Sequence, residues 1–153
     1  MRYQSGHIGR VFLAKMEHGD DILLQLERLV AAEEVESAFF LLLGAVGAAQ
    51  LVVGPEAMTI PPIPVWRQLA DGREVLGAGT VFRNPEGKPV LHLHAALGRG
   101  DSVQLGCARR QLEAYLVAEV VLLELVGLDA RRIPDPDLGV EVLDLSAGSV
   151  RRE

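Results

Sequence analysis

Two histidines separated by one leucine lie in a segment of alternating residues that runs from Val90 to Ala95. In a β-strand, alternate side chains leave opposite faces, so His92 and His94 point to the same side, about 6.6 Å apart along the chain. Two imidazoles placed in this way can bind one metal ion, because zinc accepts a neutral imidazole nitrogen at about 2.0–2.1 Å. The pattern therefore predicts two ligands of a metal site.

Cys107 is the candidate for the third ligand. Zinc also accepts thiolate sulfur, at about 2.3 Å, and a catalytic type of zinc site keeps its fourth position for water. The segment from Gly98 to Ser102 could turn the chain back and bring the residues that follow it alongside the histidines. On the residues alone a second interpretation stays open, in which the histidines are the polar side of a half-buried strand and Cys107 packs as a small apolar residue.

Two glutamates are candidates for a supporting role. Glu74 and Glu119 would orient the ligands or act as bases if they lie beside the metal, whereas glutamates in strands commonly face water. No residue is assigned to catalysis: Asp101, Ser102 and His94 include the residue types of a hydrolase triad, but no Gly-x-Ser-x-Gly motif surrounds the serine. The basic pairs of the chain are expected to lie solvated on the surface: Arg109-Arg110, Arg131-Arg132 and Arg151-Arg152.

The composition fits one folded domain. The chain has 153 residues, of which 49% are apolar, and this content excludes intrinsic disorder. A single cysteine excludes an internal disulfide and the multi-cysteine zinc frameworks. The formal net charge of −6 makes the domain alone a poor DNA binder, because duplex binding depends on Lys and Arg at the phosphates. We predict a single domain over residues 1–153, with a core from about 6 to 145 and a flexible C-terminal tail.

The N-terminal residues lack the apolar stretch and the cleavage site of a secretory signal, so we expect a cytoplasmic protein. The most apolar window, from Ala38 to Val53, is short for a bilayer span of about 20 residues and is interrupted by glycines. No membrane partner is therefore expected.

The hydrophobic patterns predict several strands and one main helix. The helix follows a cap at Gly19-Asp20 and repeats apolar residues at helical spacing from Ile22 to Val30. Strands are expected at residues 11–14, 39–43, 49–53, 74–82, 90–97 and 138–145, and in the second half of 112–126. The connecting features are a glycine turn at 44–47, a proline-rich loop at 55–64, a hairpin turn at 84–87 and a frayed end at 151–153. Together they predict an α+β fold in which a largely antiparallel β-sheet packs with one main α-helix.

Three segments occur in an order that is typical of one family. They are Gly19-Asp20-Asp21-Ile22 before the helix, Gly44-Ala45-Val46-Gly47 between apolar strands, and the run from Glu74 to Val81 that leads to Pro89–His94. The chain resembles the PPC domain (plants and prokaryotes conserved domain, DUF296) over roughly Gly6 to Leu145. The most specific element of that family is an H-x-H strand followed by a V-x-G-G-H loop, which here reads Val103-Gln104-Leu105-Gly106-Cys107.

The resemblance implies an α+β fold that assembles as a homotrimer, and prokaryotic members of the family often hold a metal ion with three histidines. His92 and His94 match the first two ligands, whereas Cys107 stands where the third histidine is usual. Two outcomes follow, a His-His-Cys zinc site or a site that has been lost. Plant members carry an AT-hook that grips the minor groove of DNA, and the Arg-Gly-Arg-Pro core of such a hook does not occur here.

Three functions are compatible with these observations. The first is a non-enzymatic homotrimeric module with a metal site and a regulatory, DNA-associated role. The second is a metal-dependent enzyme, in which a zinc-bound water attacks a small substrate. The third is sequence-tolerant DNA binding by analogy with the plant relatives. The fold class alone does not choose among them, and we take the first as the leading hypothesis.

Overall fold

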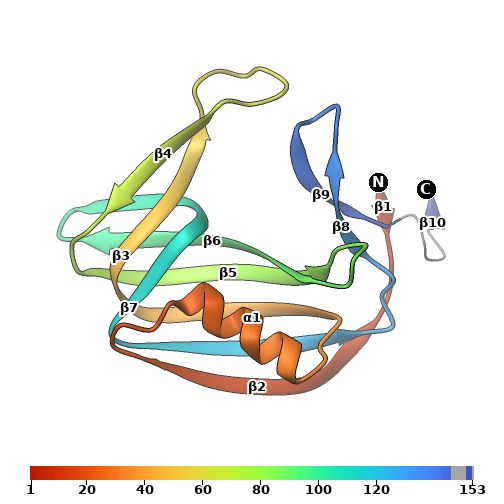
Figure 1. Cartoon of the computed structure of the whole chain (residues 1–153), viewed down its shortest axis with the longest axis horizontal. Coiled ribbons are helices and arrows are strands. Elements are labelled where there is room, and N and C mark those ends of the chain that lie inside the picture. The colour runs from red at the N-terminus through yellow and green to blue at the C-terminus, as the bar shows by residue number, and fades with distance from the viewer. Residues whose placement is uncertain (146–150, 153) are drawn as a thin grey trace.

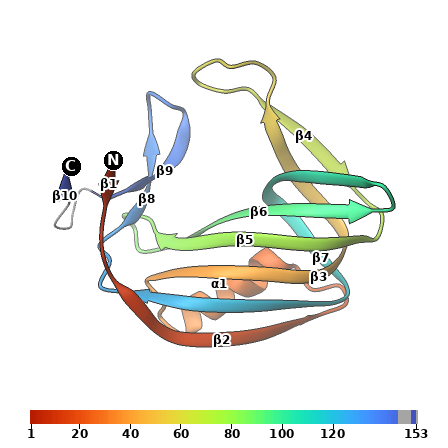
Figure 2. The same cartoon turned by 180° about the vertical axis from the view of Figure 1, so that it is seen from behind.

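A computed structural model describes residues 1–145 and 151–152 of the chain (Figures 1 and 2). Its main sheet contains β2 (His7–Glu17), β3 (Ser37–Pro55), β4 (Pro64–Leu69), β5 (Arg73–Arg83), β6 (Pro89–Arg99) and β7 (Ser102–Val126). These strands pair antiparallel in the order β2-β7-β6-β5-β3-β4, and β3 also pairs with β7. One helix, α1 (Ile22–Ala32), packs on this sheet. The predicted α+β fold with a largely antiparallel sheet and one main helix is confirmed.

The core lies between α1 and the sheet. Ile22, Leu26 and Val30 of the helix are fully buried, in a cluster with alternating strand residues such as Phe40 and Leu93. Figure 2 shows the sheet from the side opposite the helix, where no helix of the described residues covers it. Because side chains alternate along each strand, the residues between the core positions point to this uncovered face.

The helix begins at an aspartate cap, one residue later than the sequence predicted. The carboxylate of Asp21 accepts a hydrogen bond from the backbone N–H of Leu24 at 3.2 Å. The carboxylate of Asp20 accepts instead from the backbone of Glu17 and the side-chain amide of Gln25. A cap of this kind satisfies one of the N–H groups that the first helical turn leaves without a partner.

Asp21→Ala is therefore expected to lower the free energy of unfolding by about 1 kcal/mol. Denaturant titration followed by circular dichroism measures this change. Asp21→Asn keeps an accepting oxygen and is the matched control, because asparagine caps helices about as well as aspartate. Equal losses in the two variants would contradict the capping role.

The prediction of two short strands at 39–43 and 49–53 is wrong, because the chain forms the single strand β3 across both. Gly44 adopts a φ of +132°, and the register between β3 and β7 shifts just after it. A Cβ at Gly44 would lie 2.5 Å from the carbonyl oxygen of Val117, so only glycine allows this close approach of the two strands. The glycine bends the strand without ending it, as glycines in bulged strands do.

The predicted hairpin at residues 74–97 is confirmed. β5 and β6 pair from Glu74–Gly98 to Arg83–Pro89, and Asn84 closes the turn between them by accepting from the backbone N–H groups of Gly87 and Lys88. A second tight turn at Gly100, with a φ of +55°, leads from β6 into β7. β7 then continues as strand to Val126, so the whole of 112–126 is strand and not only its second half.

A small hairpin follows the main sheet. β8 (Arg131–Asp135) pairs with β9 (Val140–Asp144), and β9 lies within the predicted closing strand. Arg151 and Arg152 were expected to fray but form β10, which pairs with β1 (Arg2–Tyr3), while Glu153 and the rest of the expected tail lie outside the described residues. None of the helices in the described part of the chain has the length and hydropathy of a membrane span.

Candidate metal centre

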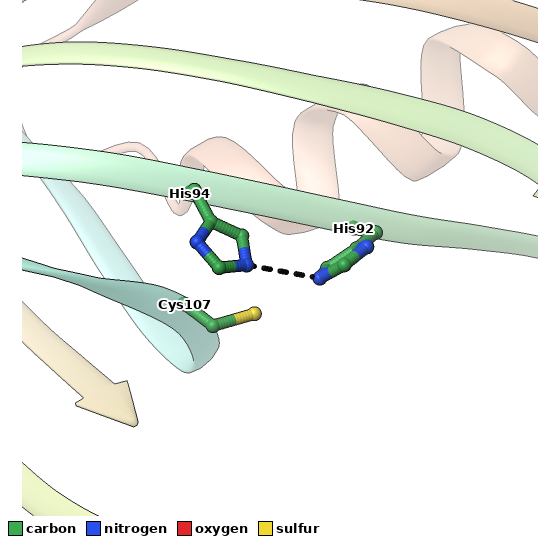
Figure 3. A group of neighbouring side chains, drawn as sticks. All are labelled: His92, His94 and Cys107. Atoms are coloured by element: carbon green, nitrogen blue, oxygen red, sulfur yellow. Dashed lines mark hydrogen bonds between the residues drawn. The ribbon is translucent and has the colours of Figure 1, made fainter. Parts of the chain in front are cut away.

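The three predicted ligands lie on neighbouring strands of the uncovered face. His94 of β6 is paired with Ala78 of β5 on one side and with Cys107 of β7 on the other. His92 is two residues earlier on β6, opposite Thr80, and so points to the same face as His94. Figure 3 shows the two imidazole rings turned toward one another, with the sulfur of Cys107 beside them. The turn at 98–102 therefore brings Cys107 to the histidines, as predicted.

The distances suit a common ion. The Nε2 atoms of His92 and His94 are 3.1 Å apart, and one ligand atom from each of the three residues lies within 4.8 Å of the others (Figure 3). In a tetrahedral zinc site, ligand atoms at 2.0–2.3 Å from the ion are about 3.3–3.8 Å from one another. Small side-chain rotations would give this spacing. Two imidazoles and a thiolate are also a donor set that zinc accepts, so the residues fit the ion.

The cluster is open on one side and closed on the other. His94 is exposed, His92 is half-buried, and Cys107 is 5% exposed. Burial raises the pKa of the Cys107 thiol, although Arg109 and Arg132 act in the opposite direction. The sulfur therefore keeps its proton at neutral pH until a metal ion displaces it.

The comparisons with known proteins agree with the fold. Residues 3–126 match the sequence profile of the Plants and Prokaryotes Conserved (PCC) domain, the family abbreviated PPC above. The chain belongs to this family. A comparison with curated proteins gives no match.

Solved structures share the fold of this PPC domain. A metal-containing protein from Archaeoglobus fulgidus is 24% identical, with 93% of this chain and 98% of that chain covered and a TM-score of 0.82. A PPC protein from Pyrococcus horikoshii is 22% identical, with 93% and 96% covered and a TM-score of 0.80. A candidate DNA-binding protein from Ralstonia eutropha JMP134 is 23% identical, with 87% and 90% covered and a TM-score of 0.73.

The PPC domain also places an arginine against the cluster that the sequence did not reveal. Arg132 of β8 donates hydrogen bonds from Nη2 to the Nδ1 of His92 and to the hydroxyl of Thr80, both at 3.1 Å. Its side chain is buried, with the guanidinium 5.9 Å from the centre of the Phe82 ring. The expectation that the pair Arg131-Arg132 is solvated is therefore wrong for Arg132, because the β8–β9 hairpin folds it against the sheet.

The hydrogen bond from Arg132 determines which nitrogen of His92 carries a proton. A guanidinium only donates, so the Nδ1 of His92 accepts, and the proton of the neutral ring is on Nε2. Burial, followed by the charges of Arg132, His94 and Arg109, lowers the pKa of His92 to about 4, which keeps the ring neutral at physiological pH. A metal ion on Nε2 requires the ring proton on Nδ1 instead. Metal binding at His92 and this hydrogen bond therefore exclude one another.

The structure does not bring Glu74 or Glu119 to the cluster. Glu74 is exposed and lies opposite Gly98, four residues along β6 from His94, which corresponds to about 13 Å. Glu119 is exposed and lies twelve residues from Cys107 along β7, where it pairs with Lys15 of β2. The carboxylate that does border this region is Glu141 of β9, which lines a small cavity together with His92 and Arg132.

Proposed function

We propose that this PPC domain is a non-enzymatic module that binds zinc through His92, His94 and Cys107 and assembles as a homotrimer with a regulatory role. The observation that carries the zinc site is the convergence of three zinc-compatible ligand atoms within 4.8 Å. The likeness to a metal-containing protein of the same fold supports it. Bound zinc would supply a fixed cation and one further coordination position, on the side where His94 is exposed.

The proposed assembly rests on the uncovered face of the sheet. The strand register gives a row across this face from Leu13 through Val121, Leu41 and Ala78 to His94. Large apolar side chains are exposed on and beside this row: Val11 62%, Leu13 79%, Leu41 43%, Leu43 45%, Leu76 65% and Leu105 60%. Contiguous apolar surface of this kind marks an interface. We propose that copies of the same chain cover the part of it on β2 and β3, with Val11, Leu13, Leu41 and Leu43, and leave the His94 end of the row open. The number three follows the resemblance to the family.

The proposed trimer predicts a mass in solution of three times the 16.5 kDa chain, measured by light scattering after gel filtration at micromolar concentration. Leu41→Glu should shift the protein to monomers, because a carboxylate would then be buried in the interface. Leu24→Glu is the matched control, since Leu24 is also 43% exposed but lies on α1, on the other side of the sheet. A wild-type protein that is monomeric at this concentration would contradict the proposal.

The role with respect to DNA is proposed to be indirect. The chain carries a formal net charge of −6 and lacks the Arg-Gly-Arg-Pro core of an AT-hook. Duplex binding draws much of its free energy from cations released by Lys and Arg contacts. A relative in fold is a candidate DNA-binding protein, and we propose that this PPC domain meets DNA through partners. Tight, salt-sensitive binding of a short duplex to the isolated protein would contradict this.

A zinc-dependent enzyme is the second candidate, and the exposed side of the cluster is the observation that favours it. A zinc-bound water that attacks a substrate needs a nearby base. Glu141 is the carboxylate that borders the cluster region among the described residues. Loss of a hydrolytic activity in Glu141→Gln with unchanged zinc content would establish the enzyme.

A further inference from the structure

Arg132 is a buried cation that forms no ion pair with any described residue. The residue is 9% exposed. Its Nε atom is buried and makes no hydrogen bond to the part of the chain that the structure describes. Removing a charged group from water costs several kcal/mol unless an opposite charge or hydrogen bonds replace the water. A buried guanidinium with an unused donor beside a candidate metal site therefore indicates a place where an anion binds.

The charges around the cluster also favour the binding of an anion. Arg109 of β7 lines the same small cavity as His92 and Arg132, so two arginine side chains lie beside this ligand. Glu141 is the acidic residue that faces Arg132, and it makes no ion pair with it within the described residues. A divalent ion bound to two neutral imidazoles and one thiolate adds a further net positive charge. The loaded site would therefore be cationic.

We infer that the fourth position of the metal centre binds a small oxyanion, a carboxylate or a phosphate group, with Arg132 as its guanidinium partner. This inference rests on the proposed zinc site. Metal binding at Nε2 of His92 puts the ring proton on Nδ1 and removes the acceptor that Arg132 Nη2 now uses. Nη2 keeps its bond to Thr80, and its released N–H together with the unpaired Nε matches the paired oxygens of a carboxylate or phosphate. Metal binding thus leaves Arg132 with a donor that is available to the anion.

The cavity limits what such a ligand can be. The space lined by Val90, Leu91, His92, Arg109, Arg132 and Glu141 has a volume of about 10 Å³. That is room for about one water molecule. The cavity therefore admits no more than one oxygen atom of the ligand, and the body of the ligand must remain outside it. The ligand class is a molecule that presents a terminal carboxylate or phosphate.

The test uses the full chain loaded with cobalt(II), which accepts the same nitrogen and sulfur ligands as zinc and whose visible absorption changes with its ligands. Titration with inorganic phosphate, and separately with acetate, is expected to change the absorption in a saturable way. The probe that binds more tightly shows whether the site prefers a phosphate or a carboxylate group. Arg132→Met should weaken anion binding by about tenfold or more, because it removes charge-assisted hydrogen bonds. Arg131→Met is the matched control, since Arg131 is exposed on the same strand, and it should leave the affinity unchanged.

The outcomes separate this inference from the proposed function. Cobalt that binds in stoichiometric amount but does not respond to either anion overturns the inference and leaves the metal site intact. A chain that takes up no metal overturns both. Equal anion affinity in wild type and Arg132→Met also overturns it. Should Arg132→Met fail to fold, Arg132→Lys serves in its place: it keeps the charge without the fork, and an unchanged affinity in that variant overturns the role of the guanidinium.

Discussion

A protein that carries His92→Ala together with His94→Ala is expected to lose its zinc. The two substitutions remove two of three ligand atoms that lie within 4.8 Å of one another and leave Cys107 alone. Changing a group that only supports a ligand costs about 10–100-fold in metal affinity, so the loss of two ligands should cost more than a hundredfold. Metal analysis of protein purified without chelator measures the effect, and wild type should contain near-stoichiometric zinc.

The chain offers a matched control for this experiment. Its four histidines are His7, His18, His92 and His94, and His7 and His18 lie exposed on or beside β2, away from the cluster. His7→Ala with His18→Ala should keep the zinc content of wild type. Circular dichroism spectra of both double variants show whether they fold. Wild-type protein without zinc, or a folded His92→Ala, His94→Ala protein that keeps it, would remove the proposed zinc site.

The two strands of the site could be predicted because their signals are local. Polar and apolar residues alternate around His92 and His94, and the glycines that form the turn at Gly100 follow within a dozen residues. Both features can be recognised from neighbouring residues alone. Arg99 of β6 pairs with Ser102 of β7 across that turn, and the antiparallel register continues without a shift. The residue five positions before Arg99, His94, therefore pairs with the residue five positions after Ser102, Cys107. The tight turn therefore determines that His94 pairs with Cys107. The turn could be predicted from the sequence, and so could this pairing.

Arg132 could not be predicted because its place depends on a long-range contact. It lies on β8, and the partner of its guanidinium, His92, is forty residues earlier. Within its own segment, Arg131-Arg132 looks like any solvated basic pair. The same limit explains the error at β3, since a glycine between apolar runs fits a turn and a bulge equally well. The close contact between Gly44 and Val117 of β7 determines that the chain forms a bulge and not a turn. This contact is long-range, so the residues around Gly44 do not predict it.

Zinc binding by wild type is expected to release about one more proton than zinc binding by the Cys107→His variant, between about pH 7 and 8. Burial raises the pKa of the Cys107 thiol above its ordinary value of about 8.5, so the sulfur must lose a proton to bind the ion. An imidazole at this position has an ordinary pKa of about 6.5 and is mostly neutral in the same range. His92, with its pKa lowered to about 4, releases no proton in either protein.

The sign of the pH dependence follows from this difference. The zinc affinity of wild type should rise about tenfold per pH unit relative to that of Cys107→His, because a deprotonated ligand binds and a protonated one competes. Calorimetry of zinc binding in buffers with different ionisation enthalpies counts the released protons directly. The variant restores the third histidine that is usual in PPC domains, so it should retain zinc and isolate the contribution of sulfur. Equal proton counts in the two proteins would mean that the thiolate of Cys107 does not bind the ion, and the donor set would then be the two histidines alone.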